Sequence, residues 1–156
     1  MLFRSNFDLE DMADKMKLNL IGVFSKDRLP VERAPGGYII NLQSEADGDG
    51  THWTYAQIFQ TKKGKTALYF DSFGAPCPLE VNKFLMPFKP IAYNNRQIQD
   101  LNSQHCGLYC IACCEFFQFV ADPKKSVVDN YEDFLNIWSW DTKKNDKILK
   151  EFLDKY

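Results

Sequence analysis

A cysteine and a glycine stand where a polar loop gives way to a long apolar segment, and this junction could support nucleophilic chemistry. Cys106 and Gly107 follow the loop of residues 99–105, and residues 108–120 are apolar and aromatic with few breaks. This pattern predicts a buried helix that begins at or beside Cys106. The N-terminus of a helix carries partial positive charge and unpaired N–H groups, so it favours the thiolate, which is the nucleophilic form of cysteine. The backbone N–H of Cys106 and the side-chain amide of Gln99, seven residues earlier, would supply two donors to an oxyanion.

Cys106 also has a simpler interpretation, as one more buried cysteine in a cysteine-rich helix. Free cysteine is among the most buried residue types and is usually inert. Cys106, Cys110 and Cys113 fall on one helical face with His105 beside them, which would be compatible with a metal site. Zinc ligands, however, usually come from a turn and a second element, and cysteines along one helix cannot readily enclose a metal. Core packing is therefore favoured for these cysteines, and no metal ligand or cofactor is predicted.

A histidine and an aspartate stand at the two ends of a predicted hairpin. Residues 51–59 and 66–70 have strand composition and flank a turn at residues 61–65. The start of one antiparallel strand lies beside the end of its partner, so His52 and Asp71 are expected at the same edge of the sheet. A carboxylate beside an imidazole fixes its tautomer and stabilises its protonated form. His52 as a surface residue and Asp71 as part of a turn remain the ordinary alternatives.

The elements that must position these residues predict an α+β fold. Helices are expected at residues 8–18, within 78–87, at 131–138 and at 141–156, and strands at 38–42 and 91–93. Residues 19–24 are a short apolar run. The continuous apolar character of residues 38–42 predicts a strand that is buried on both faces. We therefore expect a central, mostly antiparallel or mixed sheet flanked by helices, in a single domain that spans residues 1–156.

Composition and charge narrow the class of protein. The chain has 156 residues, of which 45% are hydrophobic and 15% aromatic, as expected for a globular domain with a sizeable core. The formal net charge of −2 argues against a nucleic-acid-binding surface. We expect no signal peptide and no membrane span. The five cysteines are therefore expected to be reduced, and their odd number does not suggest a disulfide framework.

The four polar residues form a plausible catalytic set in the order His52, Asp71, Gln99, Cys106. In this interpretation His52 takes the thiol proton, and Cys106 attacks an amide carbonyl. The Cys106 N–H and the Gln99 amide stabilise the tetrahedral oxyanion. His52 then protonates the leaving amine, and water hydrolyses the thioester.

Three blocks of sequence resemble the motifs of adenain, the adenovirus maturation protease, whose clan also includes the SUMO-specific proteases. These blocks are Thr51-His52-Trp53, Tyr69-Phe70-Asp71-Ser72-Phe73-Gly74 and Gln99-x-x-Asn102-Ser103-x-x-Cys106-Gly107-Leu108-Tyr109-Cys110. The seven-residue step from Gln99 to Cys106 is similar to adenain, whereas an aspartate at position 71 is the choice of the SUMO proteases. The resemblance extends through most of the chain. It implies the catalytic set above and places Trp53, Gly50 and Gly107 beside the substrate in a narrow cleft.

The same resemblance implies a thiol protease that trims capsid and core precursor proteins beside small residues, often glycine. Its source would be a virus or virus-like element, such as a virophage or a Maverick-type transposon. We expect a monomer that acts in the virion and inside the infected host cell, in the nucleus or a cytoplasmic virus factory, without a membrane partner. Adenain is stimulated by DNA and by a disulfide-linked peptide. Neither mechanism carries over, because the chain is slightly acidic and Cys77 does not fall at the expected position.

Three alternatives remain open. A protease that removes SUMO or a ubiquitin-like modifier would use the same site, because a Gly-Gly tail also needs a narrow cleft. An acyltransferase on the same fold would differ in how it excludes water. A non-catalytic binding module would keep the scaffold alone, although no residue of the proposed catalytic set is missing from the chain.

Overall fold

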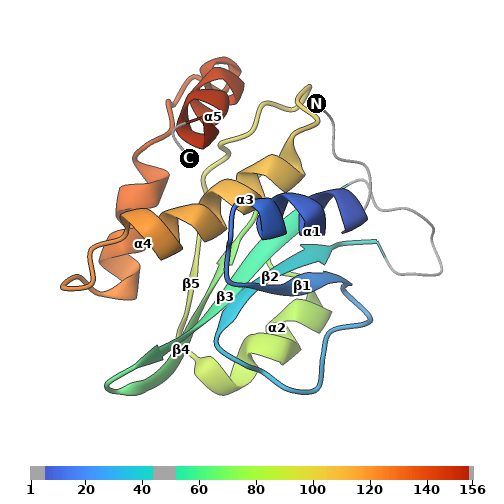
Figure 1. The fold of residues 1–156 in the computed structure, drawn as a ribbon, viewed down its shortest axis with the longest axis vertical. Coiled ribbons are helices and arrows are strands. Elements are labelled where there is room, and N and C mark those ends of the chain that lie inside the picture. The colour runs from blue at the N-terminus through green and yellow to red at the C-terminus, as the bar shows by residue number, and fades with distance from the viewer. Residues whose placement is uncertain (1–5, 44–51, 155–156) are drawn as a thin grey trace.

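The computed structural model describes residues 6–43 and 52–154, which build one mixed sheet with helices on both faces (Figure 1). The sheet has the order β1-β2-β3-β4-β5, with β1 (Leu20–Ser25), β2 (Gly36–Asn41), β3 (Trp53–Thr61), β4 (Gly64–Phe70) and β5 (Ile91–Tyr93). The central ladders β2–β3 and β3–β4 are antiparallel, whereas β1–β2 and β4–β5 are parallel. The predicted α+β class is confirmed, and the parallel pairing at both edges makes the sheet mixed.

Helices cover the two faces of the sheet unequally. One face carries α1, α3, α4 and α5, and the other carries α2 (Figure 1). The α-helices are α1 (Asn6–Lys15), α2 (Leu79–Leu85), α3 (Cys106–Glu115), α4 (Val127–Leu135) and α5 (Asn145–Leu153). Shorter turns are the 3₁₀ segments η2 (Met86–Phe88) and η4 (Thr142–Lys144) and the π-helical η3 (Phe116–Val120). No helix in the described ranges is long and apolar enough to cross a membrane.

The alternation of side chains along the strands builds two cores. In β3, Tyr55 packs into the core beneath α3, whereas Ala56 and Ile58 pack into the core beneath α2. Every residue of β2 is buried, with Ile39 on the first face and Ile40 on the second. The prediction that this strand is buried on both faces is therefore confirmed.

Helix α3 begins at Cys106, as predicted, and all of its residues are buried. A helix that is apolar all round is stable only where packing surrounds it. Gly107 permits the close approach of α1, because a Cβ at this position would lie 2.8 Å from the Leu9 side chain. The predicted helix over residues 108–120 differs in its last turn, where the α-helix gives way to the π-helical η3.

The last turn after α3 also ties together distant parts of the chain. Gln118, in η3, accepts a hydrogen bond from the backbone N–H of Asn19 at 2.6 Å. Its Nε2 donates to the carbonyl oxygen of Lys17 at 2.8 Å. This amide therefore fixes the connection between α1 and β1, and the sequence showed β1 itself only as a short apolar run.

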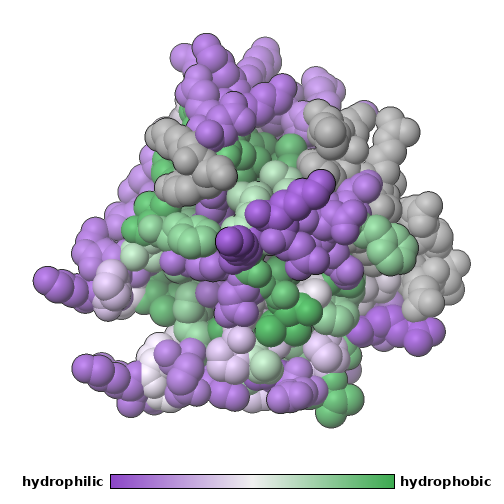
Figure 2. All heavy atoms as spheres, in the orientation of Figure 1, coloured by the Kyte–Doolittle hydropathy of each residue, from purple (hydrophilic) through white to green (hydrophobic). Residues whose placement is uncertain are grey.

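The two C-terminal helices differ from their predicted bounds. α4 begins at Val127, earlier than predicted, because the Ser126 hydroxyl accepts the N–H of Asp129 at 3.1 Å and caps the helix. α5 begins at Asn145, after the short η4 turn. It buries Leu149 and Phe152, as its amphipathic pattern predicts. The surface around α5, at the top of the view, is mostly hydrophilic (Figure 2).

Candidate active site

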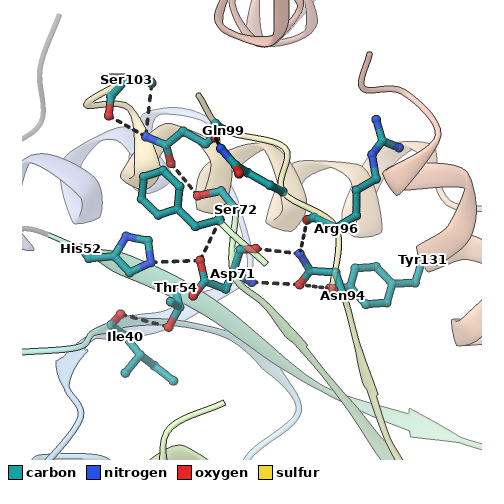
Figure 3. A network of polar contacts seen from close by, with 12 residues as sticks. Ile40, His52, Thr54, Asp71, Ser72, Asn94, Arg96, Gln99, Ser103 and Tyr131 are labelled. Atoms are coloured by element: carbon teal, nitrogen blue, oxygen red, sulfur yellow. Dashed lines mark hydrogen bonds and ion pairs between the residues drawn. The ribbon is translucent and has the colours of Figure 1, made fainter. Parts of the chain in front are cut away.

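The open end of the β3–β4 hairpin brings His52 and Asp71 into contact. Tyr55 pairs with Phe70 in this ladder, so continuing the register places Asp71 opposite Thr54. Side chains two residues apart share a face, and His52 therefore lies one diagonal step from Asp71. His52 Nε2 lies 3.0 Å from Asp71 Oδ1 (Figure 3). The predicted juxtaposition of the imidazole and the carboxylate is confirmed.

Asp71 is fully buried and is held from several sides. Its Oδ1 also accepts the backbone N–H of Phe73 at 2.8 Å. Its own backbone N–H donates to Asn94 Oδ1 at 3.0 Å, and its carbonyl accepts Asn94 Nδ2 at 2.6 Å (Figure 3). The Tyr131 hydroxyl lies 2.8 Å from the Tyr69 carbonyl and 3.1 Å from Asn94 Oδ1. The side-chain amide of Asn94, just after β5, therefore binds the backbone of Asp71 as a neighbouring strand would. It fixes the position of the residue that carries the carboxylate.

The turn after Asp71 requires a glycine at its end. Gly74 donates its backbone N–H to the Asp71 carbonyl at 2.7 Å and has a φ of +75°. A Cβ at this position would lie 2.8 Å from the Arg96 backbone. Both the backbone conformation and the close approach therefore exclude other residues, which explains the glycine of the Asp-Ser-Phe-Gly motif.

His52 is poised to remain protonated at neutral pH. Its side chain is 22% exposed, and the ring of Phe73 packs against it with centroids 4.9 Å apart. Burial alone lowers the pKa of His52, but hydrogen bonds to Asp71 and Cys106, with the negative charges of both, raise it from 6.5 to about 9. Asp71 occupies Nε2, and Nδ1 has no hydrogen-bond partner among the described residues.

Cys106 differs from the other cysteines of α3 in its surroundings. It is the first residue of the helix, is 4% exposed and interacts with His52. Burial raises the pKa of the Cys110 and Cys113 thiols well above the ordinary range and that of Cys114 to about 11. These three thiols therefore stay protonated at neutral pH.

Gln99 is fully buried, and the structure fixes both ends of its amide. The Ser72 hydroxyl donates to Oε1 at 2.6 Å. Nε2 donates to the carbonyl and hydroxyl oxygens of Ser103, at 3.0 and 3.2 Å (Figure 3). The amide nitrogen therefore faces the loop that leads into Cys106, where it is bound to Ser103.

The structure describes two of the three residues that were expected beside the substrate, and both are buried. Trp53 is 4% exposed and lies in the core beneath α3, with no partner for its Nε1 among the described residues. Gly107 is buried against Leu9, so its lack of a side chain has a packing reason. Gly50 lies outside the described residues. A role in substrate binding stays a prediction for all three.

Several contacts that support the site had no signal in the sequence. Asn94 follows the short strand β5, and no periodicity marks it as the partner of Asp71. Ser103 donates its hydroxyl to Asp146 Oδ1 at 2.9 Å, and the Tyr109 hydroxyl donates to the same oxygen at 2.9 Å. These contacts join the loop before Cys106, and α3 itself, to α5 and depend on tertiary packing alone.

The site contains no recognisable metal centre. Within residues 6–43 and 52–154, no group of three or more His, Cys, Asp or Glu side chains is placed to hold a metal ion. The five cysteines, all of which lie in the described ranges, form no disulfide with one another. Cys77, the cysteine outside α3, is half-buried, and burial raises its pKa to about 12.

Comparison with known proteins identifies the fold. No protein-family model matches the chain, and no curated protein matches it significantly. Among solved structures, the ASFV pS273R protease matches with a TM-score of 0.55 and 16% identity over 97% of this chain and 64% of that one. Its selenomethionine form matches with a TM-score of 0.53 and 17% identity over 74% of this chain and 42% of that one. The chain thus spans less than two thirds of either protein and shares with this protease a mixed sheet flanked by helices.

Proposed function

We propose that this chain is a cysteine endopeptidase in which Cys106 is the nucleophile, His52 the base and Asp71 the residue that orients it. The observation that carries the proposal is the position of His52. Its Nε2 lies 3.0 Å from Asp71 Oδ1, and Cys106 interacts with the same ring. A nucleophile beside a base, with the base oriented by a third group, is the arrangement that covalent catalysis requires. The likeness in fold to a protease supports the same function.

The reaction follows from the groups present. The Cys106 thiolate, paired with protonated His52, attacks the carbonyl carbon of a peptide bond and forms a C–S bond. The developing oxyanion accepts hydrogen bonds from the Cys106 backbone N–H and the Gln99 amide. His52 gives its proton to the leaving amine as the C–N bond breaks. A water molecule, deprotonated by His52, then hydrolyses the thioester and restores the thiolate.

The proposed substrates are capsid and core precursor proteins of a virus or virus-like element related to adenoviruses. The sequence motifs support this assignment, together with a preference for cleavage beside glycine. We place the enzyme, as a monomer, in the virion and in the interior of the infected host cell. The nearest rival is a protease for SUMO or a related modifier, since Asp71 is the acid found in that branch of the clan.

The test is to incubate the purified chain with the capsid precursor from the same genome and, separately, with a SUMO fusion, and to read the products by mass spectrometry. Trimming of the capsid precursor by the wild type, and not by Cys106→Ala, is the expected result. Processing of the SUMO fusion alone would transfer the enzyme to the isopeptidases. If neither is cut and a thiol-reactive probe fails to label Cys106 at neutral pH, the pairing of Cys106 with His52 is wrong.

A further inference from the structure

The turn that carries Asp71 and the segment of residues 94–99 contact each other at several points. Asn94 binds the backbone of Asp71, and the Arg96 backbone approaches Gly74. A further contact joins Ser72 to Gln99, the proposed oxyanion donor. Ser72 directly follows Asp71, which carries the proposed orienting carboxylate. The proposed orienting carboxylate and the residue that binds the proposed oxyanion donor therefore belong to the same turn.

Ser72 makes three hydrogen bonds to the end of this segment. Its carbonyl oxygen accepts the backbone N–H groups of Ile98 at 2.8 Å and Gln99 at 2.9 Å. Its hydroxyl donates to Gln99 Oε1 at 2.6 Å. Ser72 is 1% exposed and Gln99 has no exposed surface, so water cannot replace the hydroxyl as a partner.

These contacts determine which end of the Gln99 amide faces the loop before Cys106. The carbonyl oxygen of Ser103 can only accept a hydrogen bond, so the amide end beside it must be Nε2. Oε1 then points to Ser72 and needs a donor there, which the hydroxyl supplies. Ser103 is fixed in turn by Asp146 of α5. Nε2 carries two hydrogens, and one can serve both oxygens of Ser103 while the other is available to an oxyanion.

We propose that Ser72 is a positioning residue for the oxyanion donor, acting through its hydroxyl on Gln99. This inference rests on the proposed function, since it requires Gln99 to contact an oxyanion. Loss of the hydroxyl leaves Gln99 Oε1 buried without a hydrogen-bond partner, which is unfavourable. The Gln99 amide is then expected to move to other orientations in which Oε1 has a partner. The hydroxyl also polarises the amide, because hydrogen bonds in a chain strengthen one another and make the opposite N–H a better donor.

Two reagents separate this role from general damage to the site. Attack on p-nitrophenyl acetate builds an oxyanion at Cys106, whereas alkylation by iodoacetamide displaces iodide and builds none. We expect Ser72→Ala to slow acylation by p-nitrophenyl acetate about tenfold or more, as partial loss of an oxyanion donor should. Alkylation of Cys106 should change by less than about twofold, because the thiolate and His52 are untouched.

A double-mutant cycle then shows whether Ser72 acts through Gln99. Gln99→Ala is expected to slow acylation more than Ser72→Ala, and adding Ser72→Ala to it should have no further effect. Ser72→Thr and Ser72→Val have the same shape and differ in the hydroxyl, so the threonine variant should acylate about tenfold faster than the valine variant. Ser126→Ala, which removes a helix cap remote from the site, controls for lost stability and should leave acylation unchanged.

The outcomes distinguish the two hypotheses. If Cys106 of the wild type reacts with neither reagent faster than the other cysteines, the proposed function fails and this inference fails with it. If the wild type reacts but Ser72→Ala slows both reagents equally, or its effect adds to that of Gln99→Ala, the proposed function stands and the role of Ser72 is wrong. Equal acylation by the threonine and valine variants would also overturn it.

Discussion

Asp71 and Glu115 are the two acidic side chains with no exposed surface in the described part of the chain, and they differ in their hydrogen-bond partners. Asp71 Oδ1 accepts hydrogen bonds from His52 at 3.0 Å and from the Phe73 backbone at 2.8 Å. Neither oxygen of Glu115 has a hydrogen-bond partner among the described residues. Asp71 is therefore buried beside protonated His52 and a backbone N–H group. Glu115, at the far end of α3, is buried without such partners among the described residues.

The difference teaches that burial by itself does not identify a functional carboxyl group. Burial raises the pKa of Glu115 from 4.5 to about 7, since a lone charge is costly where water is excluded. A shifted pKa is often used to locate active sites, and on that criterion Glu115 would be chosen. The hydrogen-bond partners distinguish the two groups, because Asp71 contacts an imidazole and Glu115 has no partner among the described residues.

The sharpest test of this comparison makes the same conservative change in both regions. Asp71→Asn keeps the shape of the side chain but cannot hold the imidazolium, so cleavage of the capsid precursor should slow by on the order of 100-fold or more. Glu115→Gln should change the rate by less than about twofold, because the residue lies outside the catalytic set. Both are measured as kcat/KM, and equal losses in the two variants would contradict the distinction.

The pH dependence of cleavage should report the pairing of His52. Its raised pKa means that the folded chain holds a proton that the unfolded chain releases above about 6.5. The resulting stabilisation is fully present below that pH and is lost as the pH rises through about 9. Cleavage should fall over the same upper range, because neutral His52 cannot protonate the leaving amine.

In Asp71→Asn this upper limb of the pH profile should move to lower pH, since a bond that raises the pKa has been weakened. The profile of Glu115→Gln should match that of the wild type, so the two regions again separate. The measurement is kcat/KM from pH 6 to pH 10 for all three chains. A limb that stays in place in Asp71→Asn would show that Asp71 does not set the protonation of His52.

A smaller effect is expected on stability at Glu115. Between about pH 4.5 and pH 7 the unfolded chain releases the Glu115 proton while the folded chain retains it, so stability falls as the pH rises through this range. Glu115→Gln removes this dependence and should raise the free energy of unfolding by about 3 kcal/mol more at pH 7.5 than at pH 4.5. Urea denaturation at the two pH values measures it, and an equal change at both would mean that Glu115 finds a partner.

The smallest effect is expected for a change at Tyr131, which contacts Asn94 and through it the backbone of Asp71. Tyr131→Phe removes the hydroxyl that reaches Tyr69 and Asn94, at a cost of about 1 kcal/mol in the free energy of unfolding. Asn94 still holds the Asp71 backbone, so cleavage should slow by only about twofold to fivefold. Thermal denaturation and kcat/KM check both parts. A loss of activity as large as that of Asp71→Asn would place Tyr131 nearer the chemistry than its contacts indicate.

The site residues that the sequence placed correctly are those set by local rules. His52 and Asp71 come together because antiparallel register joins the two ends of one hairpin. The start of α3 at Cys106 follows from a polar loop that meets an apolar segment. Both predictions depend on residues close in sequence, and for that reason single-sequence patterns were sufficient.

The features that escaped sequence reasoning depend on distant packing. β1 gave only a short apolar run, because its parallel partner β2 and the Gln118 amide that anchors its start are supplied by other parts of the chain. Asn94, Ser72 and Asp146 act through side-chain hydrogen bonds that leave no periodic trace. The lack of a partner for Glu115 is a property of the folded core and could not have been inferred from a helix that was correctly predicted as buried.

The hairpin and the Gln118 amide have a consequence for the order in which the contacts of this chain form during folding. The contact between His52 and Asp71 closes 19 residues, whereas Gln118 reaches back across 99 residues to Asn19 and 101 residues to Lys17. Short loops close at lower entropic cost and sooner than long ones. The contact between the imidazole and the carboxylate can therefore form earlier in folding than the contacts of Gln118 that anchor the end of the helix bearing Cys106. On the proposed function, cleavage activity should therefore be among the last properties that the folding chain acquires, because it also requires α3 to be packed in place.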